Sequence, residues 1–299
     1  MRWCLILFQL FLLPMCARPM FAREGQLKKI TYPFTSDLID VVIPCIPKDL
    51  FTLELCIEGI KKNGKNIRRI IVLSKERLTD SAEWFSEEAF PFSKKEIALE
   101  IYGGDRRRAE EFLSSPRTRI GWIYQQLLKL YTPFVIPNLS PNVLILDSDV
   151  VFLRPIDFMT SSGEPYFIPA TEYYPAYFKH AARLVPGFKK VNPSQSGISH
   201  HMLFQRTVLE DLFRIVEKRH KTECWKAMCR CVDLDEIYGS CMSEYEIYFN
   251  FIRLRSDQPR INPAKWSQIH SMQLLDSFRR TADVFVVIPQ WLREVYGQK

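Results

Sequence analysis

The sequence NVLILDSDVVFL, residues 142–153, places two acidic residues directly after an apolar run. The run Val143–Leu146 consists of branched apolar residues, which is typical of a strand buried on both faces of a parallel sheet. In an open parallel sheet, ligands bind at the carboxyl ends of the strands. Asp147 and Asp149 follow the run directly, so we expect them at such an end.

The carboxylates of Asp147 and Asp149 can meet at one point, because residues i and i+2 of extended backbone point the same way. Two hard oxygen donors favour Mg²⁺ or Mn²⁺, which usually join protein carboxylates to substrate phosphates. Such a cation would neutralise the charge that grows on a departing diphosphate. The alternative is a plain polar turn, but burying two acids here without a cation or donors would be costly.

The residues before this stretch predict a strand–helix–strand unit. Ile39–Pro44 is a β-branched run closed by proline, Leu50–Lys62 has apolar residues at helical spacing, and Arg69–Ser74 reads as a second buried strand. The crossover of such a unit is right-handed. Together with the strand before Asp147, this predicts an α/β fold with a mostly parallel central sheet flanked by helices.

Other elements are expected around this unit. Ile97–Tyr102 is expected to form a third strand that ends at Gly103-Gly104, and Pro133 is expected to end a helix over 118–131. The remaining expectations are helices near 106–113, 208–217 and 244–252 and strands near 166–170, 202–204 and 284–288.

Composition and length indicate one domain with a large core. The chain has 299 residues, 47% of them hydrophobic, and no repeat or low-complexity tract divides it, so we expect a single domain. The net charge of +7 is spread over short clusters and forms no basic stripe, which argues against a nucleic-acid partner. The excess suits anionic ligands such as nucleotide diphosphates, and it allows peripheral association with lipid headgroups.

Residues 1–22 read as a targeting segment. Arg2 precedes the apolar run Trp3–Met15, which has the length of a signal-peptide core and is shorter than a membrane span. This predicts a signal peptide or an N-terminal anchor, and therefore an exported or membrane-anchored protein. Whether the segment is cleaved is left open.

Four of the eight cysteines cluster near the end of the chain, at Cys224, Cys229, Cys231 and Cys241. In an exported protein they would form one or two disulfides, and in a reducing compartment they could bind zinc. Cys45 and Cys56 lie in apolar surroundings and are expected to be packing residues.

The block Leu144–Phe152 resembles the D-x-D strand of GT-A glycosyltransferases, especially the glycogenin-like retaining group. In that group a helix with a basic residue and a leucine-rich stretch precedes the D-x-D strand, as Arg119 and Gln126–Leu130 do here. Asp40–Cys45 resembles the first strand of the nucleotide-binding half. The chain is also similar to an uncharacterised family of predicted glycosyltransferases, in which Ser199–Met202 and Ser243–Glu246 have counterparts.

The resemblance covers roughly residues 38–290 and implies a single GT-A domain there and a function. A sugar would pass from a nucleotide-diphosphate sugar, UDP-linked in that group, to a hydroxyl of a glycan, lipid or protein acceptor, with Mn²⁺ or Mg²⁺ as cofactor. Asp147 and Asp149 would hold the metal with His270 as third ligand, since the glycogenin-like group supplies a late histidine. The residues that would contact the donor are Pro44, Cys45, Asp49, Arg119, Lys129, Asp147 and Ser148.

Two further groups are candidates for work on the acceptor. Ser243 and Glu246 have the spacing of a helix capping box, and Glu244 or Glu246 could instead orient or deprotonate an acceptor hydroxyl, Glu244 being preferred because the cap leaves it available. His200 and His201 could bind the acceptor, but neighbouring strand residues face opposite ways, so at most one would face the site. The alternative is one buried and one exposed histidine.

Two other functions fit parts of the sequence. A haloacid-dehalogenase-type phosphatase also has D-x-D after an apolar strand, but on its first strand, whereas about 100 residues with their own strand–helix–strand unit come first here. The chain could also be a catalytically inactive, GT-A-shaped binding protein or exported effector.

Overall fold

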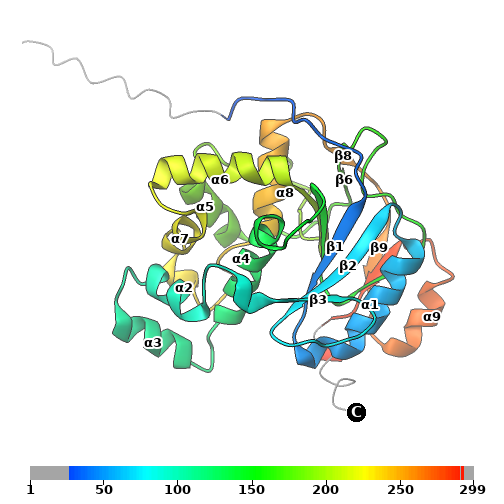
Figure 1. The fold of residues 1–299 in the computed structure, drawn as a ribbon, viewed down its shortest axis with the longest axis horizontal. Coiled ribbons are helices and arrows are strands. Elements are labelled where there is room, and N and C mark those ends of the chain that lie inside the picture. The colour runs from blue at the N-terminus through cyan, green and yellow to red at the C-terminus, as the bar shows by residue number, and fades with distance from the viewer. Residues whose placement is uncertain (1–26, 290, 293–299) are drawn as a thin grey trace, which may run out of the picture.

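Within residues 27–289 and 291–292, which the computed structural model describes, the chain is built on a five-stranded sheet in the order β3-β2-β1-β4-β7 (Figure 1). Strands β3, β2, β1 and β4 run parallel, and β7 is antiparallel to β4. The strands are β1 (Ile39–Pro44), β2 (Ile67–Ser74), β3 (Glu83–Ser86), β4 (Asn142–Leu146) and β7 (His201–Gln205). The expected mostly parallel central sheet is confirmed.

Both faces of this sheet are buried, and alternate strand residues serve two different cores. Val42 and Ile145 belong to the larger core, whereas Val41 and Leu144 belong to the smaller one. This alternation follows from the period of two along a strand. It explains why the central strands are apolar throughout rather than at every second position.

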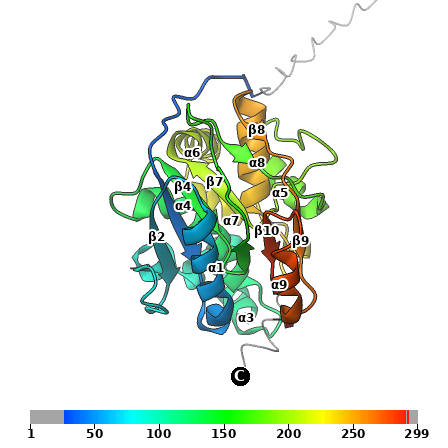
Figure 2. The same ribbon diagram turned by 90° about the vertical axis from the view of Figure 1, so that its right-hand side faces the viewer.

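Helices cover the sheet on both sides (Figures 1 and 2). The helix group on the larger core comprises α2 (Lys94–Ile101), α3 (Arg106–Ser114), α4 (Ile120–Val135), α5 (Pro175–Leu184), α6 (Arg206–His220), α7 (Cys224–Arg230) and α8 (Glu244–Arg255). On the other side lies α1 (Leu50–Asn63), with α9 (Leu275–Phe278) beside it. Short 3-10 turns occur at η1 (Pro47–Asp49), η2 (Glu87–Ala89), η3 (Leu234–Glu236) and η4 (Met272–Leu274).

A second sheet packs against α1. It consists of β5 (Val150–Phe152), β10 (Phe285–Val287) and β9 (Trp266–Gln268), with β10 antiparallel to β5. A Cβ atom at Gly59 of α1 would lie 2.9 Å from the backbone nitrogen of Phe152, so only glycine allows this close approach. Strands β6 (Tyr166–Phe167) and β8 (Arg260–Ile261) form a separate parallel pair.

Two local expectations were wrong. Ile97–Tyr102 was expected as a strand but lies in helix α2, which Ser93 and Glu96 begin with a complete capping box. The third parallel strand is instead β3, at Glu83–Ser86. Helix α4 also continues past Pro133 to Val135, because a proline in the last turn removes few helical hydrogen bonds.

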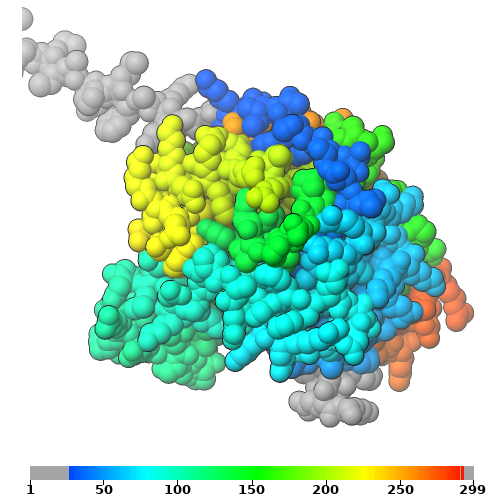
Figure 3. All heavy atoms as spheres, viewed as in Figure 1, coloured from blue at the N-terminus to red at the C-terminus, as the bar shows by residue number. Residues whose placement is uncertain are grey.

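The segment before β1 is bound to the first half of α6 and to the C-terminal end of α8. The Tyr32 hydroxyl donates to Asp211 Oδ2 at 2.9 Å, and Arg255 also binds Asp211. The Ile30 amide donates to the Arg255 carbonyl at 2.6 Å. In the space-filling view this blue segment lies beside the yellow atoms of α6 (Figure 3).

The expected targeting segment, residues 1–22, lies outside the described residues. In the part of the chain that the structure describes, no helix is both long enough and apolar enough to cross a membrane.

The clustered cysteines are part of the larger core. Cys224, Cys229, Cys231 and Cys241 are buried as unbridged thiols, and neither the disulfide nor the zinc arrangement is formed among the described residues. Burial raises the pKa of the Cys231 thiol to about 11 and that of Cys241 to about 12. These cysteines are therefore neutral packing residues in this structure. Cys45 and Cys56 are buried as expected.

Candidate active site

The site lies where the strand order reverses. From β1 the chain moves outward to β2 and β3 on one side, and β4 lies on the other side, so the carboxyl ends of β1 and β4 border a crevice. A cavity of about 450 Å³ opens at this position. Its lining includes Pro44, Cys45, Lys48, Asp49, Lys94, Arg119, Trp122, Tyr124, Asp147, Ser148 and Asp149.

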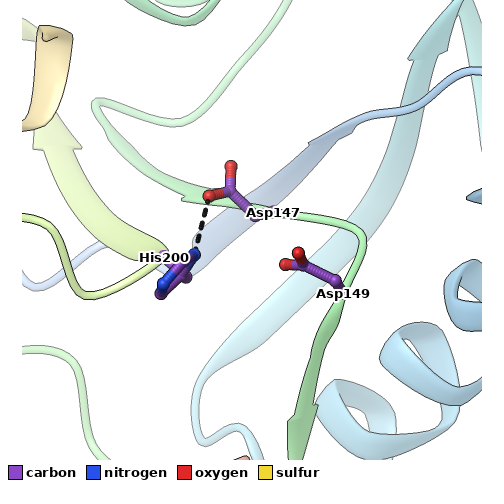
Figure 4. Close-up of side chains that lie close together, drawn as sticks. All are labelled: Asp147, Asp149 and His200. Atoms are coloured by element: carbon purple, nitrogen blue, oxygen red, sulfur yellow. Dashed lines mark ion pairs between the residues drawn. The ribbon is translucent and has the colours of Figure 1, made fainter. Parts of the chain in front are cut away.

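Asp147 and Asp149 leave the same short turn between β4 and β5 and point to one side, and His200 approaches them from the loop before β7 (Figure 4). One ligand atom from each of the three side chains lies within 4.8 Å of the other two. The imidazole Nδ1 is 3.5 Å from Asp147 Oδ2. The predicted convergence of the two carboxylates is present, and the third member of the group is a histidine.

His200 reaches this position because of its backbone. Its φ of 61° is left-handed, which is uncommon for a residue other than glycine. The Asp147 amide donates to the His200 carbonyl at 2.9 Å, and the next pair, Leu146 and His201, is in the β4–β7 ladder. The antiparallel pairing therefore places the start of β7 beside the end of β4.

The expected third ligand, His270, is not part of this group. It is exposed just beyond β9, and His200, which was expected to bind the acceptor, lies beside the aspartates in its place. The hydrogen bond from the Asp147 amide to the His200 carbonyl holds His200 against the turn. Among the described residues, no comparable backbone hydrogen bond holds His270 there.

Lys129 of α4 holds Asp147 from behind. Its ammonium lies 2.6 Å from Asp147 Oδ1 and 2.7 Å from Glu244 Oε1, and its side chain is only 3% exposed. The Tyr245 hydroxyl donates to the same Oδ1 atom at 3.1 Å. Lys129 was expected to meet donor phosphates, but it is buried beneath the cavity and is not in its lining. Its contacts make it a support for Asp147.

These contacts keep Asp147 and Lys129 ionised, whereas burial raises the pKa of Glu244. Burial alone would raise the pKa of Asp147, but Lys129 and His200 outweigh it and hold that pKa well below its usual value. Burial would lower the pKa of Lys129, and the charges of Asp147 and Glu244 raise it instead. Burial, Asp147 and Glu244 all raise the pKa of Tyr245, so its hydroxyl remains a proton donor. Asp147 is therefore an anion at neutral pH.

Glu244 and Glu246 both lie in the first turn of α8 and are buried. Ser243 caps the helix by accepting from the Glu246 amide at 3.2 Å, as the capping-box interpretation predicts. The Glu246 carboxylate does not return to the cap. It accepts from Ser196 Oγ at 2.6 Å and from Asn250 Nδ2 at 2.7 Å. Glu246 is thus held by structural partners and Glu244 by Lys129, and neither lines the cavity.

His201 belongs to the smaller core. It is 5% exposed, and its ring centroid lies 5.5 Å from that of Phe152 and 4.9 Å from that of Phe285. Burial lowers its pKa to about 4, so the ring is neutral. The expectation that His201 binds an acceptor is corrected, because a side chain packed between these rings cannot reach a ligand in the cavity.

The donor-contacting residues implied by the resemblance mostly meet at the cavity. Pro44, Cys45, Asp49, Arg119 and Ser148 line it together with Asp147. The residues that sequence reasoning missed are Trp122, Tyr124 and Lys94 in the lining and Tyr245 beneath it. Tyr245 stands next to Glu244 in the sequence, so the segment was identified but not the residue that touches Asp147.

The charge of His200 predicts how cation affinity depends on pH. Burial lowers the pKa of His200, but the hydrogen bond to Asp147 and the nearby Asp149 outweigh it and raise the pKa above 6.5. Without a cation, protonated His200 stabilises the fold at low pH, and this contribution is lost as the pH rises through the folded-state pKa. A metal ion binds only the neutral imidazole ring, so the affinity for a metal ion should rise as the pH rises.

We therefore expect the increase in melting temperature caused by Mn²⁺ to grow as the pH rises from below the ordinary histidine pKa of about 6.5 into the alkaline range. The measurement is thermal unfolding with and without Mn²⁺ across this range. In His200→Gln the increase should be smaller and nearly independent of pH. An equal pH dependence in both proteins would show that His200 is not a ligand.

Comparison with known proteins gives a family but no activity. Among solved structures, the chain is similar to mouse xyloside xylosyltransferase 1 in its apo form, with 9% identity over 85% of this chain and 98% of that chain and a TM-score of 0.42. No protein with a curated description matches the sequence. A family model matches residues 63–284, which is most of the chain. The chain therefore belongs to DUF6492, a family of unknown function.

Proposed function

We propose that this chain transfers a sugar from a nucleotide-diphosphate sugar to an acceptor hydroxyl with the help of a divalent cation. The observation that carries the proposal is the convergence of Asp147, Asp149 and His200 at the cavity where β1 and β4 end. This is the position at which open α/β sheets bind their ligands. The GT-A assignment and the single domain at residues 38–290 are part of this proposal.

The donor set fits Mn²⁺ or Mg²⁺. Two carboxylates supply hard oxygen ligands, and one imidazole adds a nitrogen that Mn²⁺ accepts more readily than Mg²⁺. When bound, the cation would supply Lewis-acid stabilisation of the departing diphosphate. The chain's own residues do the rest: Lys129 and Tyr245 hold Asp147 in place and ionised, and Arg119 lies in the lining as a cation for the phosphates.

Two finer points remain within the proposal. Pro44, Cys45 and Asp49 would surround the nucleoside of a UDP-linked donor, because they line the cavity at the end of β1. Glu244 would act on the acceptor only through its contact with Lys129 in this arrangement, because its side chain is 2% exposed. We retain the glycogenin-like retaining outcome as the stereochemical expectation.

A phosphatase of the haloacid dehalogenase type is less consistent with the structure. Enzymes of that type have their acidic pair after the first strand of the sheet, whereas here β1 ends at Pro44 and the acidic pair follows β4. A binding protein without turnover would have the same cavity as a transferase. The nucleotide-release assay described below distinguishes these two functions.

The proposal predicts that nucleotide and metal stabilise the protein together. Mn²⁺ with a nucleoside diphosphate at about 100 times its Kd should stabilise the native state by about 2.7 kcal/mol, and neither alone should reach this value. The measurement is thermal unfolding across a panel of nucleoside diphosphates, followed by release of nucleotide from the matching sugar nucleotides. EDTA should abolish the shift.

Two negative results would contradict different parts of the proposed function. A melting temperature that no nucleotide changes at saturating metal would reject the donor site. A shift without release of nucleotide from any sugar nucleotide, with water or an added acceptor, would leave the binding protein as the function.

A further inference from the structure

A short stretch of buried chain, residues 196–199, leads directly to His200, and we call it the approach segment. His200 follows it and faces the two aspartates (Figure 4). At its start, Ser196 pairs with Ala170 through two backbone hydrogen bonds of 2.8 and 2.9 Å. Ser196 and Ser199 are 0% and 2% exposed. The approach segment therefore belongs to the interior of the protein.

A carboxylate of α8 binds the approach segment at Ser196. The Ser196 hydroxyl donates to Glu246 Oε1 at 2.6 Å and accepts from the Ile198 amide at 3.1 Å. Glu246 Oε2 accepts from Asn250 Nδ2 at 2.7 Å, and Asn250 Oδ1 accepts from the Val191 amide at 2.9 Å. Glu246 and Asn250 are 1% and 0% exposed, so water does not compete for these bonds. Both carboxylate oxygens thus hold the chain just before the cation site.

Gly197 packs directly on the backbone of α8. A Cβ atom at this position would lie 2.6 Å from Phe249 Cβ and 2.7 Å from the Tyr245 carbonyl oxygen, so only glycine allows this close approach. The Tyr245 hydroxyl donates to Asp147 Oδ1 at 3.1 Å. The first turns of α8 therefore hold Asp147 on one side of the cation site and the approach segment on the other.

His200 needs support from both sides because its backbone is left-handed. A φ of 61° costs free energy in a residue other than glycine, so it persists only where neighbouring contacts fix it. On one side, the Asp147 amide donates to the His200 carbonyl. On the other side, the Ser199 amide donates to the Gly197 carbonyl at 2.9 Å, and Gly197 lies against α8. Without these contacts, His200 would be free to leave the aspartates.

We propose that Ser196, Gly197 and Glu246 are positioning residues, which hold His200 where it can bind a divalent cation. Glu246 then serves the cation and not the acceptor hydroxyl. The inference rests on the cation site of the proposed function and does not need the transfer reaction. A purely structural role would change the stability of the protein without changing the cation affinity of the folded state.

The experiment measures the Mn²⁺ affinity of the full-length protein by electron paramagnetic resonance of the free ion. Wild type, Ser196→Ala, His200→Gln and the double variant are compared at one pH, and circular dichroism checks that each is folded. Ser196→Ala should bind Mn²⁺ about tenfold more weakly, a usual loss for a group that orients a metal ligand. Because Ser196 acts through His200, the double variant should bind Mn²⁺ as His200→Gln does.

The matched control is Ser256→Ala. Ser256 follows α8 and is 2% exposed. Its hydroxyl donates to Gln258 Oε1 and accepts from the Gln258 amide, so it has the same kinds of partner as the Ser196 hydroxyl. It does not line the cavity. This variant should therefore bind Mn²⁺ as tightly as wild type does.

Glu246→Gln is a second variant that removes the carboxylate and keeps the size of the side chain. The new amide nitrogen would face Asn250 Nδ2, and two donors cannot form a hydrogen bond. One hydrogen bond to the chain before His200 is therefore lost. Mn²⁺ affinity should again fall about tenfold, and the change should have no further effect when His200 is already glutamine.

Three results would overturn the inference. If Ser196→Ala and Glu246→Gln bind Mn²⁺ as wild type does, or if their losses add to that of His200→Gln, the positioning role is wrong and the cation site stands. If wild type binds no Mn²⁺, the cation site of the proposed function is wrong as well. If the expected pattern is found but no sugar nucleotide is turned over, the inference stands and the transferase proposal fails.

Discussion

Replacing Asp149 with asparagine is expected to lower sugar transfer about a thousandfold and leave the fold intact. A factor of this size corresponds to about 4 kcal/mol of transition-state stabilisation, which is within what a bound cation supplies. Asparagine keeps the volume of the side chain, so the packing around this 8% exposed residue should be preserved. Turnover is measured as nucleotide release at saturating Mn²⁺, and the fold by circular dichroism.

The matched control is Asp157→Asn. Asp157 is also near β5 in the sequence, but its side chain is 44% exposed and pairs with Lys65 at 2.8 Å outside the cavity. This variant should transfer at the wild-type rate. If Asp149→Asn retained activity within about threefold of wild type, the cation site would be misassigned.

Replacing Lys129 with methionine is expected to reduce the free energy of unfolding by about 3–5 kcal/mol. The change keeps the length of the side chain but leaves the carboxylates of Asp147 and Glu244 without the ammonium that lies between them. The side chains of Lys129 and Glu244 are 3% and 2% exposed, so water cannot replace the lost partner. The measurement is urea-induced unfolding without metal.

Two comparisons show whether this loss comes from unpaired charge. Lys65→Met removes an ammonium from an exposed pair and should cost at most about 1 kcal/mol. The double change Lys129→Met with Glu244→Leu should recover part of the loss, because an apolar pair needs no counter-ion. If Lys129→Met were no more destabilising than Lys65→Met, the buried network would contribute little.

The sheet and the acidic pair could be predicted because both depend on local pattern. Apolar runs rich in β-branched residues marked β1, β2 and β4. The strand period of two predicted that Asp147 and Asp149 would converge, and they do, but from the turn between β4 and β5 and not from extended backbone. Because open parallel sheets bind ligands at the carboxyl ends of their strands, the two aspartates were expected at a ligand site.

The error at Ile97–Tyr102 was avoidable. The spacing of Ser93 and Glu96 is that of a capping box, and this signal was present in the sequence before the apolar residues that suggested a strand. Four residues with mixed polarity, Glu83–Ser86, form the third parallel strand instead, and they show no strong period.

The partners of Asp147 could not be predicted, because they depend on long-range pairing. His200 contacts Asp147 from the loop before β7, and Lys129 contacts it from α4. The left-handed backbone of His200 has no sequence signature in a histidine. Lys129 stands on an apolar helix, where a lysine suggests an exposed cation for phosphates. Its burial follows only once Glu244 of α8 is known to lie against it.

The antiparallel pairing of β4 with β7 has a consequence for how the cation site comes into being. A nascent chain that has been synthesised only as far as β5 already carries both aspartates, yet it lacks His200 and the strand that orients it. Closure of the ladder joins segments more than fifty residues apart, and contacts of this kind form late because they carry a large loop-closure entropy. The proposed cation site is therefore a feature of the finished sheet and not of the Asp-Ser-Asp motif alone, so incomplete chains would lack its third member while they fold.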